Sequence, residues 1–143
     1  MNHLPSLYHM AEVEEIPILS YPLPQTGSLA LQLDDGRCYI GMDYNAITDE
    51  RDQAVHLSHE LGHCLTGAFY NRHAKMDLRQ RQEIKADKWA IHHLVPMDEL
   101  DDAIARGYTE FWDLADYFGV TVDFMKKAVC LYTHGNLEAD LYF

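Results

Sequence analysis

The residues His59-Glu60-Leu61-Gly62-His63 carry the strongest signal in this chain. They lie in a segment with helical periodicity, where side chains four positions apart share one face, so His59 and His63 point in the same direction. Two imidazoles arranged in this way can bind one divalent metal ion, with Glu60 beside the open side of that ion. The pattern is typical of zinc hydrolases, in which the glutamate is the catalytic base that accepts a proton from the metal-bound water.

A third metal ligand is predicted at Glu83, because a catalytic zinc ion usually has three protein ligands and one open position. Glu83 opens the segment Glu83-Ile84-Lys85-Ala86-Asp87, in a second predicted helix whose Ala86 and Ala90 would allow close packing on the first helix. Asp87, one turn later, is predicted to accept a hydrogen bond from the non-ligating nitrogen of a ligand histidine. The alternative is a lattice of exposed charged side chains without a metal.

Length and composition favour one cytoplasmic domain over residues 1–143. The chain is 48% hydrophobic and carries a formal charge of −12, from 23 acidic and 11 basic residues. Such a surface repels nucleic acids and anionic membranes, so no direct contact with either is expected, and it attracts cations or basic proteins. No signal peptide or membrane span is recognised. Three scattered cysteines are predicted to be free thiols in a reducing compartment, namely Cys38, Cys64 and Cys130.

Residues 28–43 have the alternation of a β-hairpin, with Asp35-Gly36 as a two-residue turn. This turn predicts three facing pairs whose six side chains are all buried on one face of the sheet: Leu33 with Cys38, Leu31 with Ile40, and Leu29 with Met42. An edge of this hairpin could hold an extended peptide by strand addition.

The remaining periodicity is mainly helical. Thr48 or Asp49 is predicted to begin the helix of the metal motif, and Gly67 to end it. Other helices are expected at about residues 79–95, 98–106, 109–118 and 122–132, after a short helix around residues 4–10 and an extended connector at 16–23. The predicted fold class is therefore α+β, with a small antiparallel sheet packed on a mainly helical body.

Two segments together resemble the ImmA/IrrE family of small cytoplasmic metallopeptidases: HELGH at 59–63 and EIKADKWAIHHLVP at 83–96. In that family the glutamate is followed by Ala-Asn/Asp, an aromatic-Ala pair and an apolar segment ending in proline. Ala86-Asp87, Trp89-Ala90 and Leu94-Val95-Pro96 occupy these places here. The same residues match the gluzincin plan, in which the glutamate is the third zinc ligand. His92-His93 departs from the family, whose members usually carry small or apolar residues there.

The resemblance implies a minimal zincin-like domain that holds one Zn²⁺ ion and cleaves a protein or peptide substrate. It also implies a link to phages or mobile elements, with a DNA-binding repressor as the substrate. The rival interpretation is a metal-containing module that sequesters a regulatory partner protein without cutting it. A second rival, DNA binding by the helix pair at 114–129, is disfavoured because Val122, Asp123, Phe124 and Met125 are poor readers of base edges.

Peptide hydrolysis also needs a donor for the developing oxyanion. Residues of suitable chemistry that could stabilise the oxyanion or contact the substrate are Tyr70, His73, His92 and Tyr108.

Overall fold

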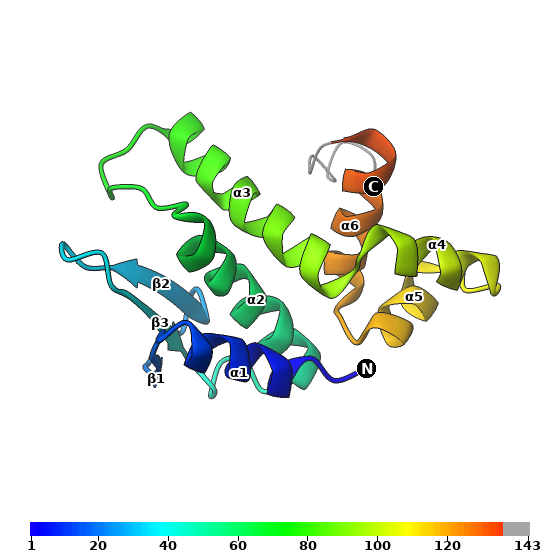
Figure 1. The fold of residues 1–143 in the computed structure, drawn as a ribbon, viewed down its shortest axis with the longest axis horizontal. Coiled ribbons are helices and arrows are strands. Elements are labelled where there is room, and N and C mark those ends of the chain that lie inside the picture. Colours follow the sequence, from blue (N-terminus) through cyan, green and yellow to red (C-terminus); the bar gives the residue numbers. More distant parts are fainter. Residues whose placement is uncertain (136–143) are drawn as a thin grey trace.

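Six helices and one three-stranded sheet form residues 1–135, the part of the chain that the computed structural model describes (Figure 1). Residues 136–143 of the predicted domain lie outside this part. The elements are α1 (Leu4–Val13), β1 (Ile18–Ser20), β2 (Ser28–Gln32), β3 (Cys38–Met42), α2 (Glu50–Thr66), α3 (Met76–Leu94), α4 (Met97–Ala105), α5 (Phe111–Phe118) and α6 (Val122–His134). The predicted α+β class, with a small sheet on a helical body, is confirmed.

The hairpin of β2 and β3 is antiparallel as predicted, but the sheet is mixed, with strand order β1-β3-β2, so the prediction of an antiparallel sheet was incomplete. β1 lies in the segment predicted as an extended connector and runs parallel to β3, with Ile18 opposite Ile40. The prolines on both sides of this segment, Pro17 and Pro22, favour extended backbone, which is also the backbone of a strand. Pairing with β3 is a tertiary contact that the local pattern could not show.

The predicted register of the hairpin was wrong by one residue. Leu31 faces Tyr39, and Ser28 faces Met42. The turn has three residues rather than two, because the N–H of Leu33 donates to the carbonyl of Arg37 at 2.8 Å and Gly36 adopts a φ of +89°. A shift of one residue moves a strand's side chains to the other face of the sheet.

As a consequence, the three leucines of the β2 hairpin arm lie on the outer face, where Leu29 is 49%, Leu31 53% and Leu33 40% exposed. Ser28 instead turns inward, toward α2, and is only 6% exposed.

Helix α2 begins and ends where the sequence predicted. Asp49 is its N-cap and accepts hydrogen bonds from two backbone N–H groups of the first turn, and Gly67 follows its last residue. Helix α3 crosses α2 at very short range: a Cβ added to Gly62 would lie 2.6 Å from the backbone oxygen of Ala86. Ala86 and Ala90 are fully buried, so small side chains allow this approach.

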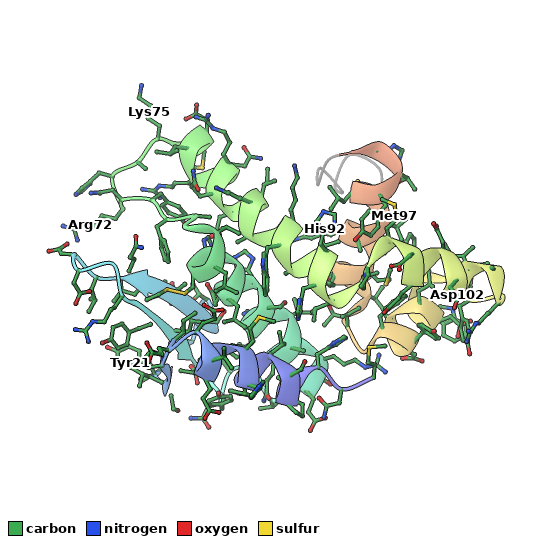
Figure 2. All side chains as sticks on the ribbon, in the orientation of Figure 1. Tyr21, Arg72, Lys75, His92, Met97 and Asp102 are labelled. Carbon is green, nitrogen blue, oxygen red and sulfur yellow. A yellow bond between two sulfur atoms is a disulfide. The ribbon has the colours of Figure 1, made fainter. Side chains whose placement is uncertain are left out.

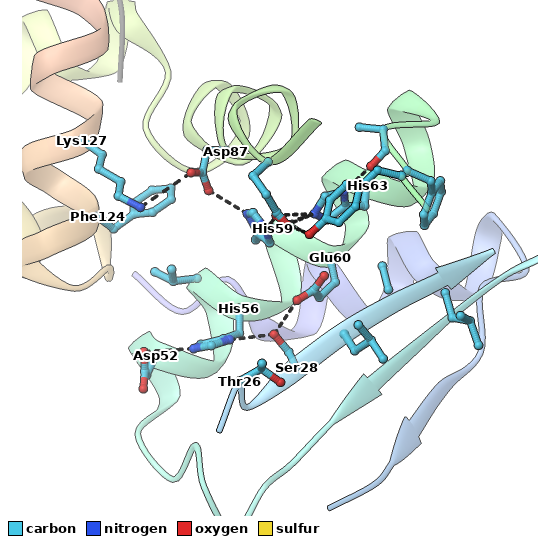
Figure 3. A pocket seen from close by; sticks show the side chains of 18 of the residues that line it. Thr26, Ser28, Asp52, His56, His59, Glu60, His63, Asp87, Phe124 and Lys127 are labelled. Atoms are coloured by element: carbon cyan, nitrogen blue, oxygen red, sulfur yellow. Dashed lines mark hydrogen bonds and ion pairs between the residues drawn. The ribbon is translucent and has the colours of Figure 1, made fainter. Parts of the chain in front are cut away.

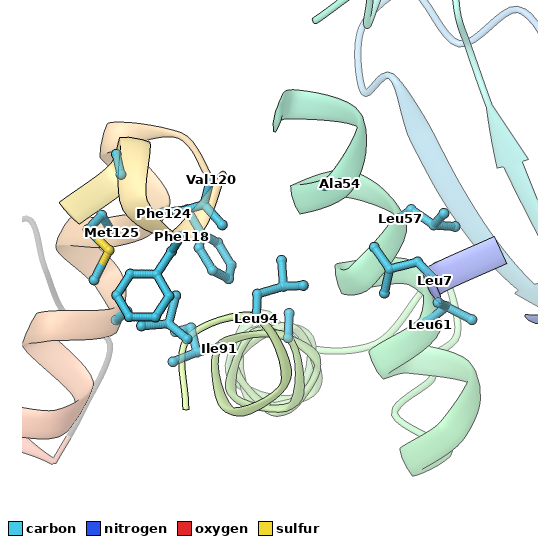
Figure 4. Packing of buried hydrophobic residues seen from close by; sticks show 14 of the residues in the cluster. Leu7, Ala54, Leu57, Leu61, Ile91, Leu94, Phe118, Val120, Phe124 and Met125 are labelled. Carbon is cyan, nitrogen blue, oxygen red and sulfur yellow. The ribbon is translucent and has the colours of Figure 1, made fainter. Parts of the chain in front are cut away.

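Helix α3 has hydrophobic core on both sides (Figure 4). On one side its residues face Leu57 and Leu61 of α2 and Leu7 of α1, all fully buried. On the other side Ile91 and Leu94 pack toward the pair formed by α5 and α6. The tail pair is thus attached to the body of the domain through α3. In the described part of the chain no helix is both long and apolar enough to cross a membrane.

Cys38 and Cys64 form a disulfide, with Cα atoms 5.9 Å apart, which corrects the prediction of three free thiols. Cys130 is free and buried. The bond joins the start of β3 to α2, next to His63, across 26 residues of sequence. The expected reducing compartment therefore loses its support from the cysteines, since structural disulfides are typical of oxidising environments.

Candidate metal centre

The side chains of His59, His63 and Glu83 converge on one point between α2 and α3 (Figure 3). The two Nε2 atoms are 3.2 Å apart. Glu83 Oε2 lies 3.2 Å from Nε2 of His59 and 3.0 Å from Nε2 of His63. Ligand atoms about 2.0–2.1 Å from a tetrahedral zinc ion are roughly 3.3 Å from one another. The three atoms therefore have nearly the spacing of three corners of a zinc site.

The outer nitrogens of the two histidines explain why these atoms can act as ligands. Nδ1 of His59 lies 2.7 Å from Asp87 Oδ1, and Nδ1 of His63 contacts the carbonyl oxygen of Ala68. Both partners accept hydrogen bonds only, so each Nδ1 carries a proton and donates it. In the neutral rings both Nε2 lone pairs then point at each other and at the carboxylate. Three acceptors cannot meet in this way without a cation or added protons between them.

The charges of these groups are strongly coupled. Burial alone would lower the pKa of His59, but hydrogen bonds to Asp87 and Glu83 outweigh it and raise the pKa to about 10. The pKa of His63 is also raised, because its hydrogen bond to Glu83 outweighs burial. Burial opposes ionisation of Glu83, yet hydrogen bonds from both histidines hold its pKa well below the ordinary value. Without a metal, protons occupy the position that a cation would fill.

Glu60 lies on the side of α2 that faces β2 (Figure 3). The Ser28 hydroxyl donates to Glu60 Oε2 at 2.6 Å, and Nδ1 of His56 lies 2.7 Å from the same hydroxyl oxygen. One carboxylate oxygen of Glu60 and one nitrogen from each of the two convergent imidazoles lie within 4.8 Å of one another. Glu60 is thus beside the candidate metal position, and Ser28 holds one of its carboxylate oxygens.

Sequence reasoning missed both Ser28 and His56. The spacing of His56 and Glu60, four residues apart on one helix, was a usable signal for His56. The wrong hairpin register hid Ser28, because it assigned this residue to the solvent face.

A cleft of about 1210 Å³ opens over the convergent side chains. Its walls come from the start of β2, from α2, from the loop after α2 and from the start of α6; apolar contributions include Leu31, Phe69 and Phe124. Arg72 and Lys127 add positive charge. Because β2 is an edge strand, its unpaired side borders this cleft.

Tyr70 and His73, two of the four predicted donors, line the cleft. The Tyr70 hydroxyl lies 3.4 Å from Glu83 Oε1, and burial together with the charge of Glu83 raises the pKa of this phenol. Both residues lie in the loop between α2 and α3, the segment that also contains Arg72 and Lys75, which are labelled in Figure 2.

The structure does not bring His92 and Tyr108 to this site. His92 lies near α6, where its Nδ1 is 3.3 Å from the hydroxyl of Tyr132 (Figure 2). Tyr108 packs against Tyr117, with ring centres 5.0 Å apart. Neither is among the described residues that line the cleft. His92 lies in the last turn of α3 and Tyr108 follows α4, so both are close to the tail helices, a tertiary fact that residue type alone cannot reveal.

Lys127 of α6 is a further member of the site that the sequence did not indicate. Its Nζ lies 3.6 Å from Oδ2 of Asp87, whose other oxygen holds His59 (Figure 3). The tail helix pair therefore reaches the candidate metal centre through one side chain.

Comparison with known proteins identifies the family of the chain. The family model Peptidase_M78, described as the IrrE N-terminal-like domain, matches residues 11–129 and so includes all the convergent residues. No curated protein and no solved structure matches the chain at a significant level. Because the match covers most of the chain, the protein belongs to the IrrE N-terminal-like domain family of peptidases.

Proposed function

We propose that the protein is a zinc-dependent peptidase in which His59, His63 and Glu83 bind one Zn²⁺ ion and Glu60 is the general base. The observation that carries this proposal is the convergence of two imidazole Nε2 atoms and one carboxylate oxygen, 3.0–3.2 Å apart. Two nitrogen ligands and one oxygen ligand with a vacant fourth position suit catalytic zinc. When bound, a zinc ion polarises the substrate carbonyl and makes water a stronger nucleophile.

Glu60 is positioned to move the proton. Its Oε2 is held by Ser28, which leaves Oε1 to take a proton from the attacking water and then to pass it to the leaving amine. Tyr70 is the candidate donor to the developing oxyanion, because its hydroxyl lies at the edge of the same group of side chains.

The substrate is proposed to be an extended stretch of a protein. The free edge of β2 borders the cleft and can pair with such a stretch as an added strand. A DNA-binding repressor is the candidate substrate that the family resemblance supplies. The net charge of −12 makes direct binding to nucleic acid unfavourable, so the contact would be with the protein.

The test combines metal content with cleavage. Zinc is measured by mass spectrometry in the purified parent, Glu83→Ala and Glu60→Gln, and hydrolysis is followed with fluorescein-labelled casein and randomised quenched peptides. We expect Glu83→Ala to lose zinc, and Glu60→Gln to keep zinc without cleaving either probe. Glu50→Gln, an exposed glutamate in the first turn of α2, is the matched control and should behave as the parent.

Cleavage by Glu60→Gln at the parent's rate would show that the assigned base is wrong. A parent that binds zinc but cuts neither these probes nor a repressor that it binds would support the sequestering module instead.

A further inference from the structure

We propose that Ser28 and His56 are positioning residues that fix the carboxylate of Glu60 for proton transfer. The inference rests on the proposed peptidase function. It adds two residues, one on β2 and one on α2, that neither the metal motif nor the family match assigns.

The direction of each hydrogen bond follows from the atoms present. A serine hydroxyl has one proton, and here it is donated to Glu60 Oε2 at 2.6 Å. The oxygen of Ser28 must then accept from Nδ1 of His56, which is 2.7 Å away. His56 therefore carries its proton on Nδ1, while its Nε2 faces Asp52 at 3.8 Å. The chain of donors runs in one direction, from the imidazole to the hydroxyl to the carboxylate.

The surroundings of Ser28 indicate that this arrangement is specific. Ser28 shares the inner face of the sheet with Ile40 and Met42, which are fully buried, and both Ser28 and Glu60 are 6% exposed. A buried hydroxyl on an apolar face is costly unless its hydrogen bonds are made. Its two partners come from one stripe of α2, since His56 and Glu60 are one helical turn apart. These hydrogen bonds thus connect the first residue of β2, the strand that borders the cleft, to Glu60.

Ser28, His56 and Asp52 also have the residue types of a nucleophilic triad, but the hydrogen bonds run the wrong way. In a triad the imidazole accepts the hydroxyl proton. Here the hydroxyl proton is given to Glu60, and the imidazole donates to the hydroxyl. Ser28 is therefore not activated as a nucleophile, and the protein should not be labelled at Ser28 by phenylmethylsulfonyl fluoride.

The main test compares two variants of nearly equal shape, Ser28→Thr and Ser28→Val, which differ in the hydroxyl group. A misplaced general base reduces turnover more than binding, so we expect kcat of Ser28→Val on the casein and peptide probes to fall at least about tenfold below that of Ser28→Thr, with KM and zinc content unchanged. The control is Ser58→Ala, which removes a different buried hydroxyl. Ser58 lies on α2 and donates its proton to the backbone carbonyl of Val55, so this variant should keep the parent's kcat.

A second pair tests His56. Asparagine can place an N–H donor close to the position of Nδ1, and leucine has a similar shape without a donor. His56→Asn should retain more kcat than His56→Leu, again without a change in zinc content or melting temperature between the two.

A spectroscopic measurement tests the same hydrogen bonds without any substrate. Long-range ¹H–¹⁵N spectra report which nitrogen of an imidazole ring carries the proton. We expect Nδ1–H for His56 in the parent and in Ser28→Thr, and a shift of the proton toward Nε2 in Ser28→Val. A parent His56 with its proton on Nε2 would overturn the proposal whatever the activity.

The outcomes separate this inference from the proposed function. If Glu60→Gln is inactive while Ser28→Val and Ser28→Thr have equal kcat, the positioning role is wrong and the peptidase assignment stands. If Glu60→Gln cleaves as well as the parent, Glu60 is not the general base, so the proposed mechanism and the positioning role of Ser28 and His56 are both wrong. Labelling of Ser28 by the sulfonyl fluoride with loss of activity would replace both with a serine hydrolase.

Discussion

Each of the two convergent histidines is held by its outer nitrogen, and this contact determines what its inner nitrogen can do. Asp87 accepts from His59, and the carbonyl of Ala68 accepts from His63, so both Nε2 atoms are left as acceptors. The side chain of Asp87 is itself contacted by Lys127. A carboxylate in this position fixes the tautomer and raises the basicity of a ligand imidazole.

Replacing Asp87 by asparagine should therefore weaken zinc binding. The amide keeps the shape of the side chain but removes its charge, and we expect the zinc affinity to fall by about 10–100-fold. Competition with a chromophoric chelator measures this affinity. The control is Asp98→Asn, an exposed residue in the first turn of α4, and equal affinities for the two variants would contradict the role of Asp87.

The raised pKa of His59 predicts a pH dependence of stability. Its pKa is about 10 in the metal-free folded protein, against an ordinary value of 6.5. The folded state therefore binds the proton of His59 more tightly than the unfolded state does, and the resulting stabilisation is fully present below pH 6.5. That gain is lost as the pH rises toward 10. A bound zinc ion replaces the proton, so the loss should be confined to the metal-free form.

The measurement is the increase in melting temperature caused by zinc. This increase should grow as the pH is raised from 6.5 to 10. An increase that stays constant over this range would contradict the proton–metal exchange.

At the scale of helices and strands, the close crossing of α2 and α3 brings Glu83 to the two histidines. Gly62, in the middle of the metal motif, meets the backbone of Ala86 and leaves no room for a side chain. The contact is backbone against backbone, so neither helix can adjust by moving a flexible group.

Gly62→Ala should push the helices apart. The new Cβ would lie 2.6 Å from the oxygen of Ala86, and such overpacking typically costs about 1–3 kcal/mol of stability. Because α3 carries Glu83, we also expect zinc affinity to fall. Thermal melting and chelator competition measure the two effects. Gly41→Ala is the control, since its new Cβ would meet the flexible end of Leu23 at 3.3 Å and Cβ of Tyr21 at an ordinary contact distance of 3.8 Å. A Gly62→Ala protein with the parent's zinc affinity would contradict the role of the close helix crossing in placing Glu83.

The elements show what the sequence could and could not predict. The ends of α2 were correctly predicted because Asp49 and Gly67 act locally, within one turn of the helix. The register of the hairpin was not, because turns of two and three residues share the Asp35-Gly36 signal and yet expose opposite faces. The spacing of His59, His63 and Glu83 predicted their convergence. Ser28 and Lys127 reach the site through tertiary packing, which no local pattern encodes.

Considered as a whole, the molecule has its sheet at one end, its tail helices at the other and α3 between them (Figure 1). The cleft takes one wall from the sheet and another from α6, so it depends on both ends being attached. The disulfide between Cys38 and Cys64 fixes the sheet to α2.

Removing this disulfide should destabilise the whole domain. It closes a loop of 26 residues, and a loop of this size predicts a loss of about 2–4 kcal/mol in the free energy of unfolding. Urea denaturation of the double variant Cys38→Ser/Cys64→Ser measures the loss. Reductant should lower the stability of the parent and leave that of the double variant unchanged; equal sensitivity of the two proteins would mean that the bond does not form in solution.

The place of the disulfide, one residue after His63, has a practical consequence for handling the protein. Dithiothreitol added during purification would reduce the disulfide between Cys38 and Cys64. The two thiols of dithiothreitol would also compete with the protein for zinc, since thiolates are strong ligands of this ion. A protein purified with that reagent would lack both the disulfide and the bound zinc ion. Loss of zinc in such a sample would be caused by the buffer and would not measure the zinc affinity of the protein.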